Sequence, residues 1–380
     1  MEVNAEELEA PLDLTAVQWD HQNYRFLLEA RGIDVLSLRD ALTNGAIDAV
    51  GEPEEGPPLD RLRSVAAEAL DYRFAPGVSE ARRRVLLERR DRIIERAHPE
   101  VLADLLLLRP LVKVGFDGDP AMMEYTVRPA LAAHFVRDAL IATAAGAVMG
   151  RASNPARRWE NRLMSLAMKQ LGTRPVAEVV EPGFLEGGDF IPGGDFALLR
   201  VGPSSNREAF EQILRAGAFG VPEVALVRDG DTSLVHLDDY LVFVGPGHAV
   251  VHEDRLEASG EPVVEIYDAS EVRTEGPSRE VGFREYLAEK GKEVVAARPE
   301  SPYTLSGLMV LGPNEVVVAA GVGDSPTVAL REMGVDVQVL ELEAAGGRGG
   351  LRGLTQVLRR GEDKADTRSE ERAWNSRFGI

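Results

Sequence analysis

From Gly115 onward the sequence alternates pairs of short apolar runs with single helical segments, and this order restricts the fold more than any other feature. Turn dipeptides such as Gly193-Gly194 and Gly245-Pro246 separate many of the runs. We expect strands at 139–143, 147–149, 196–201, 224–227, 241–244, 250–252, 263–266, 308–311, 316–319 and 335–340, and helices at 207–216, 282–291 and 325–333. Strand pairs followed by a helix predict repeated ββαβ units in an α/β architecture.

The first third of the chain reads differently. Residues 18–30 form an amphipathic pattern that predicts a helix, and Ile33 to Leu36 predict a short buried strand. Pro, Gly and acidic residues at 50–60 indicate a loop, and apolar spacing from 61 to 112 is helical throughout. We therefore expect a helical insertion at 51–115.

The chain of 380 residues has no cysteine, which excludes disulfides, thiolate metal sites and thiol catalysis together. Its formal net charge of −20 argues against nucleic-acid and membrane partners, because such a surface repels phosphates. The sequence shows neither a secretory signal nor the roughly 20 apolar residues of a membrane span. These features predict a cytoplasmic protein.

Two local patterns bring carboxylates next to groups that could do chemistry. In the first, Gly187 and Gly188 separate Glu186 from Asp189, which holds the backbone in a tight shape. In the second, His236 and Asp238 would share one face if they lie on an extended strand, and a His beside a carboxylate suits general acid/base work. Taken alone, the first is an ordinary acidic turn and the second a polar strand edge.

Two further patterns are equally weak by themselves. Asp138 closes the run Phe135-Val-Arg-Asp, and the pair Arg157-Arg158 follows it and could hold a carboxylate bidentately. Near the C-terminus, glycines at 346–353 require sharp bends or a close approach to a ligand. The plainer interpretations are a surface ion-pair network and a flexible loop.

The order of the four patterns along the chain resembles the arginine deiminase family. The resemblance covers roughly residues 15–360 and implies the fold of that guanidine-modifying superfamily, a pentein-like five-bladed pseudo-symmetric α/β propeller. It assigns 1–50 to a first, incomplete blade, 51–115 to the helical insertion, 116–360 to the remaining blades and 361–380 to a charged C-terminal tail.

The resemblance also implies roles for individual residues. Asp138 and Asp238 would bind the planar guanidinium of an arginine-like ligand, whose five donors suit two carboxylates. Glu186 and His236 would be the catalytic acid/base pair. Arg157 or Arg158, together with Arg207, would bind the carboxylate of the amino-acid ligand.

The chain departs from the family where the nucleophile should be. The family's C-terminal Gly-rich loop ends in a cysteine, and the matching position here is Gly353, which has no side chain to attack with. Thr355 lies nearby, but a hydroxyl is a far weaker nucleophile. Two other departures are the missing opening strand and the Leu131-Ala132 pair, where the family has Pro-Asn.

Three functions follow from this pattern. The first is an enzyme acting on an arginine-like guanidine or amidine by non-covalent acid/base chemistry, a hydrolase without a covalent intermediate. The second is an inactive homologue that binds such a ligand or partners an active enzyme. The third is an acidic scaffold whose motifs are structural. We favour the first and expect neither a metal nor a cofactor; a homo-oligomer is compatible with the sequence.

Overall fold

The computed structural model describes residues 14–130, 132–231, 233–257, 260–269, 276–300, 304–342 and 350–358. The predictions for Leu131, for the loop at 346–349 and for the tail at 361–380 lie outside these residues. The chain divides into two compact units. The first takes in the described residues of Met1–Val35, Phe135–Ser153 and Val176–Gln356, and the second those of Leu36–His134, Asn154–Pro175 and Val357–Ile380.

The first unit contains four three-stranded groups. Each group is an antiparallel hairpin whose second strand also pairs in parallel with a third strand. The hairpins are β4 (Leu140–Thr143) with β5 (Gly146–Met149), β7 (Phe190–Pro192) with β8 (Phe196–Val201), β10 (Leu241–Val244) with β11 (His248–His252), and β15 (Leu308–Gly312) with β16 (Glu315–Ala319). The third strands are β6 (Ala177–Glu178), β9 (Glu223–Arg228), β14 (Glu293–Ala297) and β17 (Asp336–Leu340). This order confirms the α/β architecture of ββαβ units.

A helix precedes each third strand, as the strand-helix-strand order of a parallel connection requires. These helices are α6 (Arg158–Gln170), α7 (Arg207–Arg215), α8 (Phe283–Glu289) and α9 (Asp324–Glu332). An additional hairpin, β12 (Val263–Asp268) with β13 (Arg279–Gly282), extends the second sheet by pairing β12 with β9. The strands bury continuous apolar runs, and Leu198, Leu199 and Leu226 are fully buried in the two clusters around β8 and β9.

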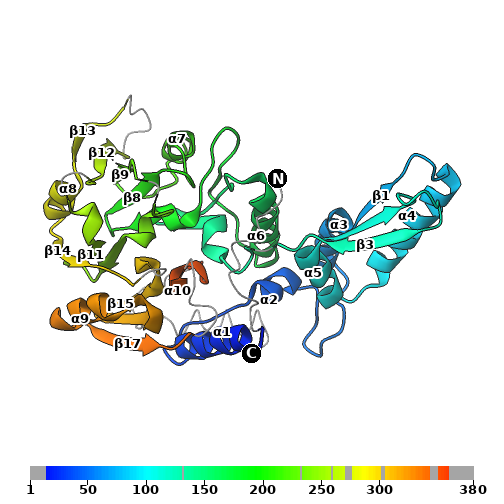
Figure 1. Cartoon of the computed structure of the whole chain (residues 1–380), viewed down its shortest axis with the longest axis horizontal. Coiled ribbons are helices and arrows are strands. Elements are labelled where there is room, and N and C mark those ends of the chain that lie inside the picture. Colours follow the sequence, from blue (N-terminus) through cyan, green and yellow to red (C-terminus); the bar gives the residue numbers. More distant parts are fainter. Residues whose placement is uncertain are drawn as a thin grey trace. The chain divides into compact units, whose positions relative to one another are not determined.

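A 3₁₀ turn precedes the first strand of each three-stranded group, directly in three cases and with Tyr240 between turn and strand in the fourth. These turns are η2 (Val136–Ala139), η4 (Gly187–Asp189), η5 (Leu237–Asp239) and η7 (Leu305–Gly307). Successive turns contact one another, and the short helix α10 (Gly350–Gly353) contacts both η7 and η2. The four turns and α10 therefore close a ring of five segments, which we call the hub ring, and Figure 1 shows the sheets of this unit grouped around α10.

The N-terminal helix α1 (Leu14–Glu29) packs Tyr24, Leu27 and Leu28 into the apolar core of the β15–β17 sheet. The strand predicted at 33–36 is wrong, because these residues form no strand. Ile33 and Leu36 are 37% and 45% exposed. Burying them would have been the main gain from forming a strand there.

The second unit contains α2 (Leu38–Thr43), α3 (Pro57–Ala69), α4 (Glu80–Arg96), α5 (Pro99–Leu108) and α6, together with a sheet of β1 (Asp71–Phe74), β2 (Pro110–Val114) and β3 (Met123–Val127). The expected helical character of 51–115 is thus incomplete, since β1 and β2 pair in parallel within it. These two strands are only four and five residues long. Runs that short show no clear alternation of apolar and polar residues, so the sequence does not distinguish them from the neighbouring helices.

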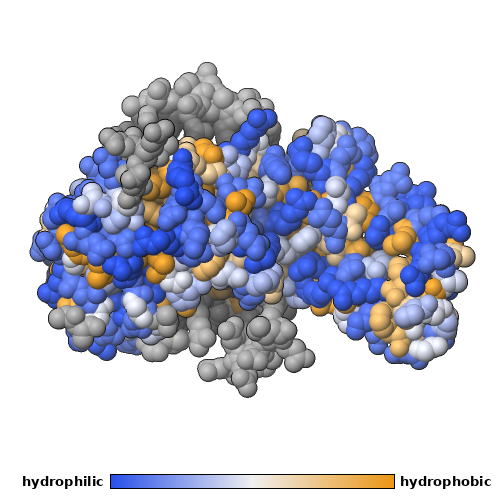
Figure 2. Space-filling model, turned by 90° about the horizontal axis from the view of Figure 1, so that it is seen from above, coloured by the Kyte–Doolittle hydropathy of each residue, from blue (hydrophilic) through white to orange (hydrophobic). Residues whose placement is uncertain are grey.

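The described surface is mostly hydrophilic, with small separate hydrophobic areas on the face shown in Figure 2. Among the described residues, no helix is long and apolar enough to cross a membrane.

Candidate active site in the hub ring

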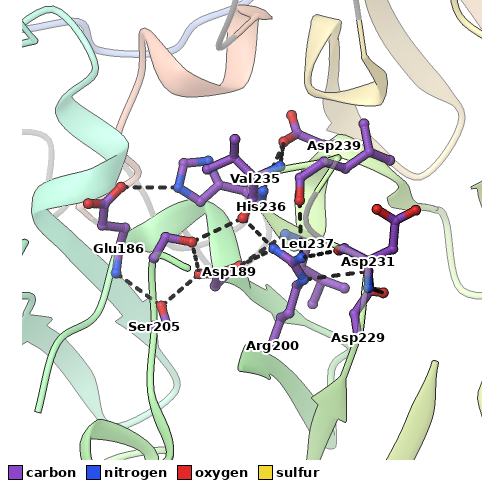
Figure 3. A network of polar contacts seen from close by, with 12 residues as sticks. Glu186, Asp189, Arg200, Ser205, Asp229, Asp231, Val235, His236, Leu237 and Asp239 are labelled. Atoms are coloured by element: carbon purple, nitrogen blue, oxygen red, sulfur yellow. Dashed lines mark hydrogen bonds and ion pairs between the residues drawn. The ribbon is translucent and has the colours of Figure 1, made fainter. Parts of the chain in front are cut away.

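The hub ring brings together residues that lie about 50 positions apart in the sequence. Asp138 lies in η2, Glu186 directly before η4, and His236 directly before η5. One ligand atom of each of these three side chains lies within 4.8 Å of the other two. The His236 Nε2 atom is 3.1 Å from Glu186 Oε2, and Figure 3 shows the two side chains pointing toward each other.

Asp238 lies within η5 and is buried, two residues beyond His236. The expectation that these two residues share the face of a strand is wrong, because a 3₁₀ turn begins directly after His236 and contains Asp238. The turn is fixed by Asp239, whose Oδ2 accepts hydrogen bonds from the backbone N–H groups of Val235 and His236 at 3.1 and 2.9 Å.

The two residues after Glu186 must be glycines, because neighbouring atoms approach their backbone too closely for a side chain. A Cβ at Gly187 would lie 2.0 Å from the backbone oxygen of Arg137 in the neighbouring turn η2. A Cβ at Gly188 would lie 2.6 Å from the His236 ring. The Glu-Gly-Gly-Asp sequence therefore lets η4 pack directly against η2 on one side and against the imidazole on the other.

Asp189, the last residue of η4, is fully buried and connects η4 to η5 through hydrogen bonds. Its Oδ2 accepts hydrogen bonds from Ser204 and Ser205 at 2.6 and 2.7 Å, and its Oδ1 accepts one from the Leu237 N–H at 3.2 Å. Ser205 in turn accepts from the Glu186 N–H at 3.1 Å (Figure 3). This single carboxylate thus holds the backbone of Leu237 directly and that of Glu186 through Ser205.

Arg200, on strand β8, is a second buried anchor that sequence reasoning missed. Its side chain is 0% exposed and lies 3.7 Å from Asp189 and 3.6 Å from Asp229, distances of ion pairs without hydrogen bonds. It also donates to the backbone oxygens of Asp231, Leu234 and Val235, in the segment that leads to His236. The sequence signal was one arginine inside an otherwise apolar strand, which must be paired when buried.

The electrostatics of the site favour a cation among the carboxylates. Burial by itself would lower the pKa of His236, but the hydrogen bond to Glu186 and the charges of Asp138, Asp189 and Asp238 raise that pKa well above 6.5. Burial raises the pKa of Asp238 to about 6, against the positive charges of Arg352 and His236. The carboxylates around the His236 ring thus outweigh the effect of its burial on the pKa.

The α10 segment presents Arg352 to this cluster. Its Nε atom lies 3.4 Å from Asp238 Oδ2, an ion pair between side chains that are 11% and 4% exposed. The backbone oxygen of Arg352 accepts a hydrogen bond from Arg137 Nε at 2.5 Å. Burial and the neighbouring Arg352 lower the pKa of Arg137 to about 10. Asp238 therefore already has a guanidinium partner, supplied by the chain itself.

Gly353, the position matching the family's cysteine, is the last residue of α10. A Cβ there would lie 3.1 Å from the Phe135 ring, and a positive φ is found at Gly350 (53°) rather than at Gly353. Backbone strain therefore does not explain the glycine. The Thr355 hydroxyl donates to the backbone oxygen of Leu351 at 3.4 Å.

Two of the three arginines predicted to bind a ligand carboxylate, Arg207 and Arg157, have partners within the protein. Arg207 donates to Tyr267 at 2.8 Å and to Glu265 at 2.6 Å, both on β12. Arg157 and Arg158 belong to the second unit, where Arg157 Nε pairs with Glu160 at 3.1 Å and Arg158 begins α6. Their role in ligand binding stays a prediction.

A family model described as arginine deiminase matches residues 7–360. The chain belongs to the arginine deiminase family. An arginine deiminase of Listeria innocua is 26% identical over 256 residues, which is 61% of this chain and 62% of the Listeria enzyme. The arginine deiminase of Halobacterium salinarum is 26% identical over 187 residues, 35% of this chain and 37% of that enzyme. The chain thus spans less than two thirds of these relatives.

Solved structures of similar proteins are more distant than these arginine deiminases. A DDAH of Pseudomonas aeruginosa, solved as a mutant with citrulline, has a TM-score of 0.43 at 16% identity, covering 58% of this chain and 73% of that one. The N-terminal domain of ArgZ, an arginine dihydrolase of cyanobacteria, has a TM-score of 0.46 at 16% identity, covering 66% and 79%. Because these scores are low, membership of the arginine deiminase family depends on the sequence match.

Proposed function

We propose that this protein binds an arginine-like guanidine or amidine at the hub ring and acts on it by non-covalent acid/base chemistry. The observation that carries the proposal is the meeting of Asp138, Glu186 and His236 within 4.8 Å, beside Asp238, in a family member without a cysteine. Holding several buried ionisable groups together costs free energy, and a ligand of opposite charge offsets that cost.

The chemistry available to this site is hydrolysis with water as the nucleophile. His236 and Glu186, 3.1 Å apart, can take a proton from water and return it to the leaving nitrogen. A C–O bond then forms at the guanidinium carbon while a C–N bond breaks, which releases ammonia and leaves a urea. Asp138 and Asp238 would hold the cationic part of the substrate through its N–H donors.

A ligand that uses Asp238 must first displace Arg352. The buried ion pair of Arg352 with Asp238 presents the carboxylate with a guanidinium before any ligand arrives. A bound arginine-like molecule would replace one guanidinium by another, so the net charge around Asp238 would not change. Binding through Asp238 therefore includes a movement of the Arg352 side chain.

The same ion pair favours a second candidate function, a catalytically inactive protein that binds an arginine-like ligand or partners an active homologue. Gly353 provides no nucleophile, and loss of a nucleophile usually costs many orders of magnitude in rate. Ligand binding needs only the carboxylates and survives that loss. The two functions differ in whether a product forms.

Thermal unfolding with arginine, agmatine and citrulline tests binding, and mass spectrometry of the incubated ligands tests turnover. We expect the two cationic ligands to raise the melting temperature more than neutral citrulline does, because only they neutralise the carboxylates. Glu186→Gln should abolish turnover, whereas His248→Gln, at another His–carboxylate pair, should not. Equal stabilisation by citrulline argues against the guanidinium site, and binding without product selects the inactive protein.

A further inference from the structure

We propose that strand β3 is a dimerisation edge, along which a second copy of this chain adds its own β3 in the antiparallel direction. The inference does not depend on the proposed function, because β3 belongs to the second unit and the hub ring to the first. Strands β1 and β3 are the two edges of the three-stranded sheet in the second unit (Figure 1). Among the described strands, only β2 pairs with β3.

The backbone of β3 presents a row of hydrogen-bonding groups to this edge. Met122, directly before β3, faces β2, because its carbonyl accepts a hydrogen bond from the Gly115 N–H at 3.0 Å. In an antiparallel strand, the peptide groups of alternate residues face opposite sides. The N–H and C=O groups of Met123, Tyr125 and Val127 therefore face away from β2. Such a row is a template for an added strand.

The apolar face of the sheet continues onto this edge. Val112 of β2 is buried and lies opposite Tyr125, and opposite residues share one face of a sheet. Val127 lies on the same face, two residues beyond Tyr125. The side chains of Tyr125 and Val127 are 69% and 56% exposed. A second β3 would extend the sheet at the point where its apolar face now ends in two exposed side chains.

Charge distinguishes β3 from the other edge of the sheet. Strand β1 carries Asp71 and Arg73 at alternate positions, and charged edge residues of this kind oppose pairing. Strand β3 carries one charged residue, Glu124, among five. Residues 36–134 hold 14 Lys and Arg against 17 Asp and Glu, so little of the net charge of −20 belongs to this part of the chain. Long-range repulsion between two copies is therefore weak here.

The outward-facing groups of two copies match in a register centred on Tyr125. Tyr125 then lies opposite Tyr125 of the second copy, and Met123 opposite Val127, so each outward-facing residue meets another. Sliding one strand by two residues in one direction would place Glu124 opposite Glu124, and like charges directly opposite repel. Sliding it in the other direction would place Met123 opposite Pro129, which has no N–H to donate.

Side chains on the other face of β3 also complement one another in this register. Glu124 lies opposite Thr126 of the second copy, whose hydroxyl can donate a hydrogen bond to the carboxylate. Lys113, on β2 of the same chain, has its Nζ atom 3.9 Å from Glu124. Residues directly opposite one another in this row therefore carry no like charges. The dimer that results is symmetric, with the same strand contributed by both copies.

Analytical ultracentrifugation of the full chain at rising concentration tests the proposal. We expect a reversible dimer whose dissociation constant responds to the charge at exposed Thr126. Thr126→Glu places a like charge opposite Glu124 of the second copy and should weaken the dimer about tenfold, since the contact occurs twice. Thr126→Lys places an opposite charge there and should tighten the dimer. Val85→Glu and Val85→Lys, at an exposed position of α4, change the net charge equally and should have no effect.

A single cysteine tests the register by a second method, because the chain has none of its own. Opposite residues of a hydrogen-bonded antiparallel pair have Cα atoms about 5.5 Å apart. A short bis-maleimide should therefore link two copies of Tyr125→Cys into a covalent dimer. Val50→Cys, whose side chain is equally accessible to the reagent, should stay monomeric under the same conditions.

Three results would overturn the proposal. A monomer at every concentration would leave the edge to a strand of a different protein. A dimer that is insensitive to the charge at Thr126 would place the interface elsewhere on the chain. A dimer weakened by both Thr126→Glu and Thr126→Lys would mean a register centred on Thr126, in which that residue lies opposite its own copy. Circular dichroism of each variant shows whether the monomer keeps its fold.

Discussion

Arg352 and Asp238 decide how a ligand can enter the candidate site. Their ion pair at 3.4 Å is buried, and Asp238 is one of two carboxylates expected to bind a ligand's guanidinium. The sequence showed Asp238 as a candidate, but it could not show that Arg352, 114 positions later, lies on it. This contact between residues far apart in the sequence forms only because α10 packs against η7 and η2 in the hub ring.

Replacing Arg352 should therefore favour ligand binding. In Arg352→Gln the ligand no longer competes with an internal guanidinium, so we expect arginine to bind roughly tenfold more tightly, about 1.4 kcal/mol. The variant without ligand should melt at a lower temperature, because Asp238 loses its partner. Calorimetric titration with arginine measures the change. Arg352→Lys keeps a cation and should show little gain; an equal gain in both variants would contradict the competition.

Gly353→Cys tests whether this position faces the cluster. The new Cβ would lie 3.1 Å from the Phe135 ring, so we expect a loss of about 1 kcal/mol from overpacking. A thiol that faces the raised-pKa imidazole of His236 should itself have a lowered pKa and react faster with iodoacetamide than a cysteine at exposed Val50. Gly353→Ala separates the packing cost from the thiol. Alkylation no faster than at position 50 would mean that the thiol points away.

At the scale of secondary-structure elements, strand β8 supports the site through Arg200. Arg200→Met would remove one buried cation from both Asp189 and Asp229, leaving Asp229 only Arg255, and would release the backbone before His236. We expect the free energy of unfolding to fall by about 3–5 kcal/mol in urea denaturation. Arg215→Ala, at an exposed pair with Glu211, should change it by less than about 0.5 kcal/mol. Similar small effects in both variants would contradict an anchoring role for Arg200.

Helix α7 and strand β12 are joined by Arg207 and Glu265, and this pair should respond to pH. Burial would raise the pKa of Glu265, but hydrogen bonds from Arg207 and Tyr267 outweigh it and lower that pKa below 4.5. A lowered pKa in the folded state contributes stability above pH 4.5 that is lost as the pH falls through the lowered value. Glu265→Gln lacks this dependence.

The difference in unfolding free energy between the original chain and Glu265→Gln should therefore be constant above pH 4.5 and shrink below it. Urea denaturation at several pH values measures the difference. Glu211→Gln, on the exposed face of α7, is the matched control and should differ little from the original chain at every pH. A difference that grows on acidification would contradict the assignment.

Elements were predictable where burial and length gave a clear pattern. The run from Phe196 to Val201 became β8 without a shift, because six apolar-rich residues between turns leave few alternatives. His236 and Asp238 were expected on a strand, yet His236 directly precedes a 3₁₀ turn that contains Asp238, and the three residues of that turn carry no period of their own. The sequence thus identified the chemical groups, and the turns that orient them appeared only in the structure.

At the scale of the whole molecule, the net charge of −20 should make stability depend on salt. Repulsion among like charges destabilises a compact chain, and salt screens it. Between about 10 mM and about 150 mM salt the Debye length falls from about 30 Å to about 8 Å. We expect the melting temperature to rise over this range, equally in NaCl and KCl. A fall would mean that surface ion pairs outweigh the repulsion.

Family membership at the whole-chain scale came from the order of weak motifs. No single motif among Asp138, Glu186-Gly187-Gly188-Asp189 and His236-Leu-Asp238 distinguishes the chain from an ordinary acidic protein. The family model matches residues 7–360, a range that includes all of these motifs. The sequence could not predict which side chains pair with one another at the centre of the hub ring, because they come from four separate segments.

The hub ring is completed by its last segment in the chain. Because η7 and η2 meet through α10, a nascent chain that has left the ribosome only as far as η7 contains every predicted acid and base but an unclosed centre. During that interval Asp238 has no Arg352 beside it. Synthesis itself therefore imposes an order on this protein: the charged side chains come first, and the helix that neutralises one of them comes last.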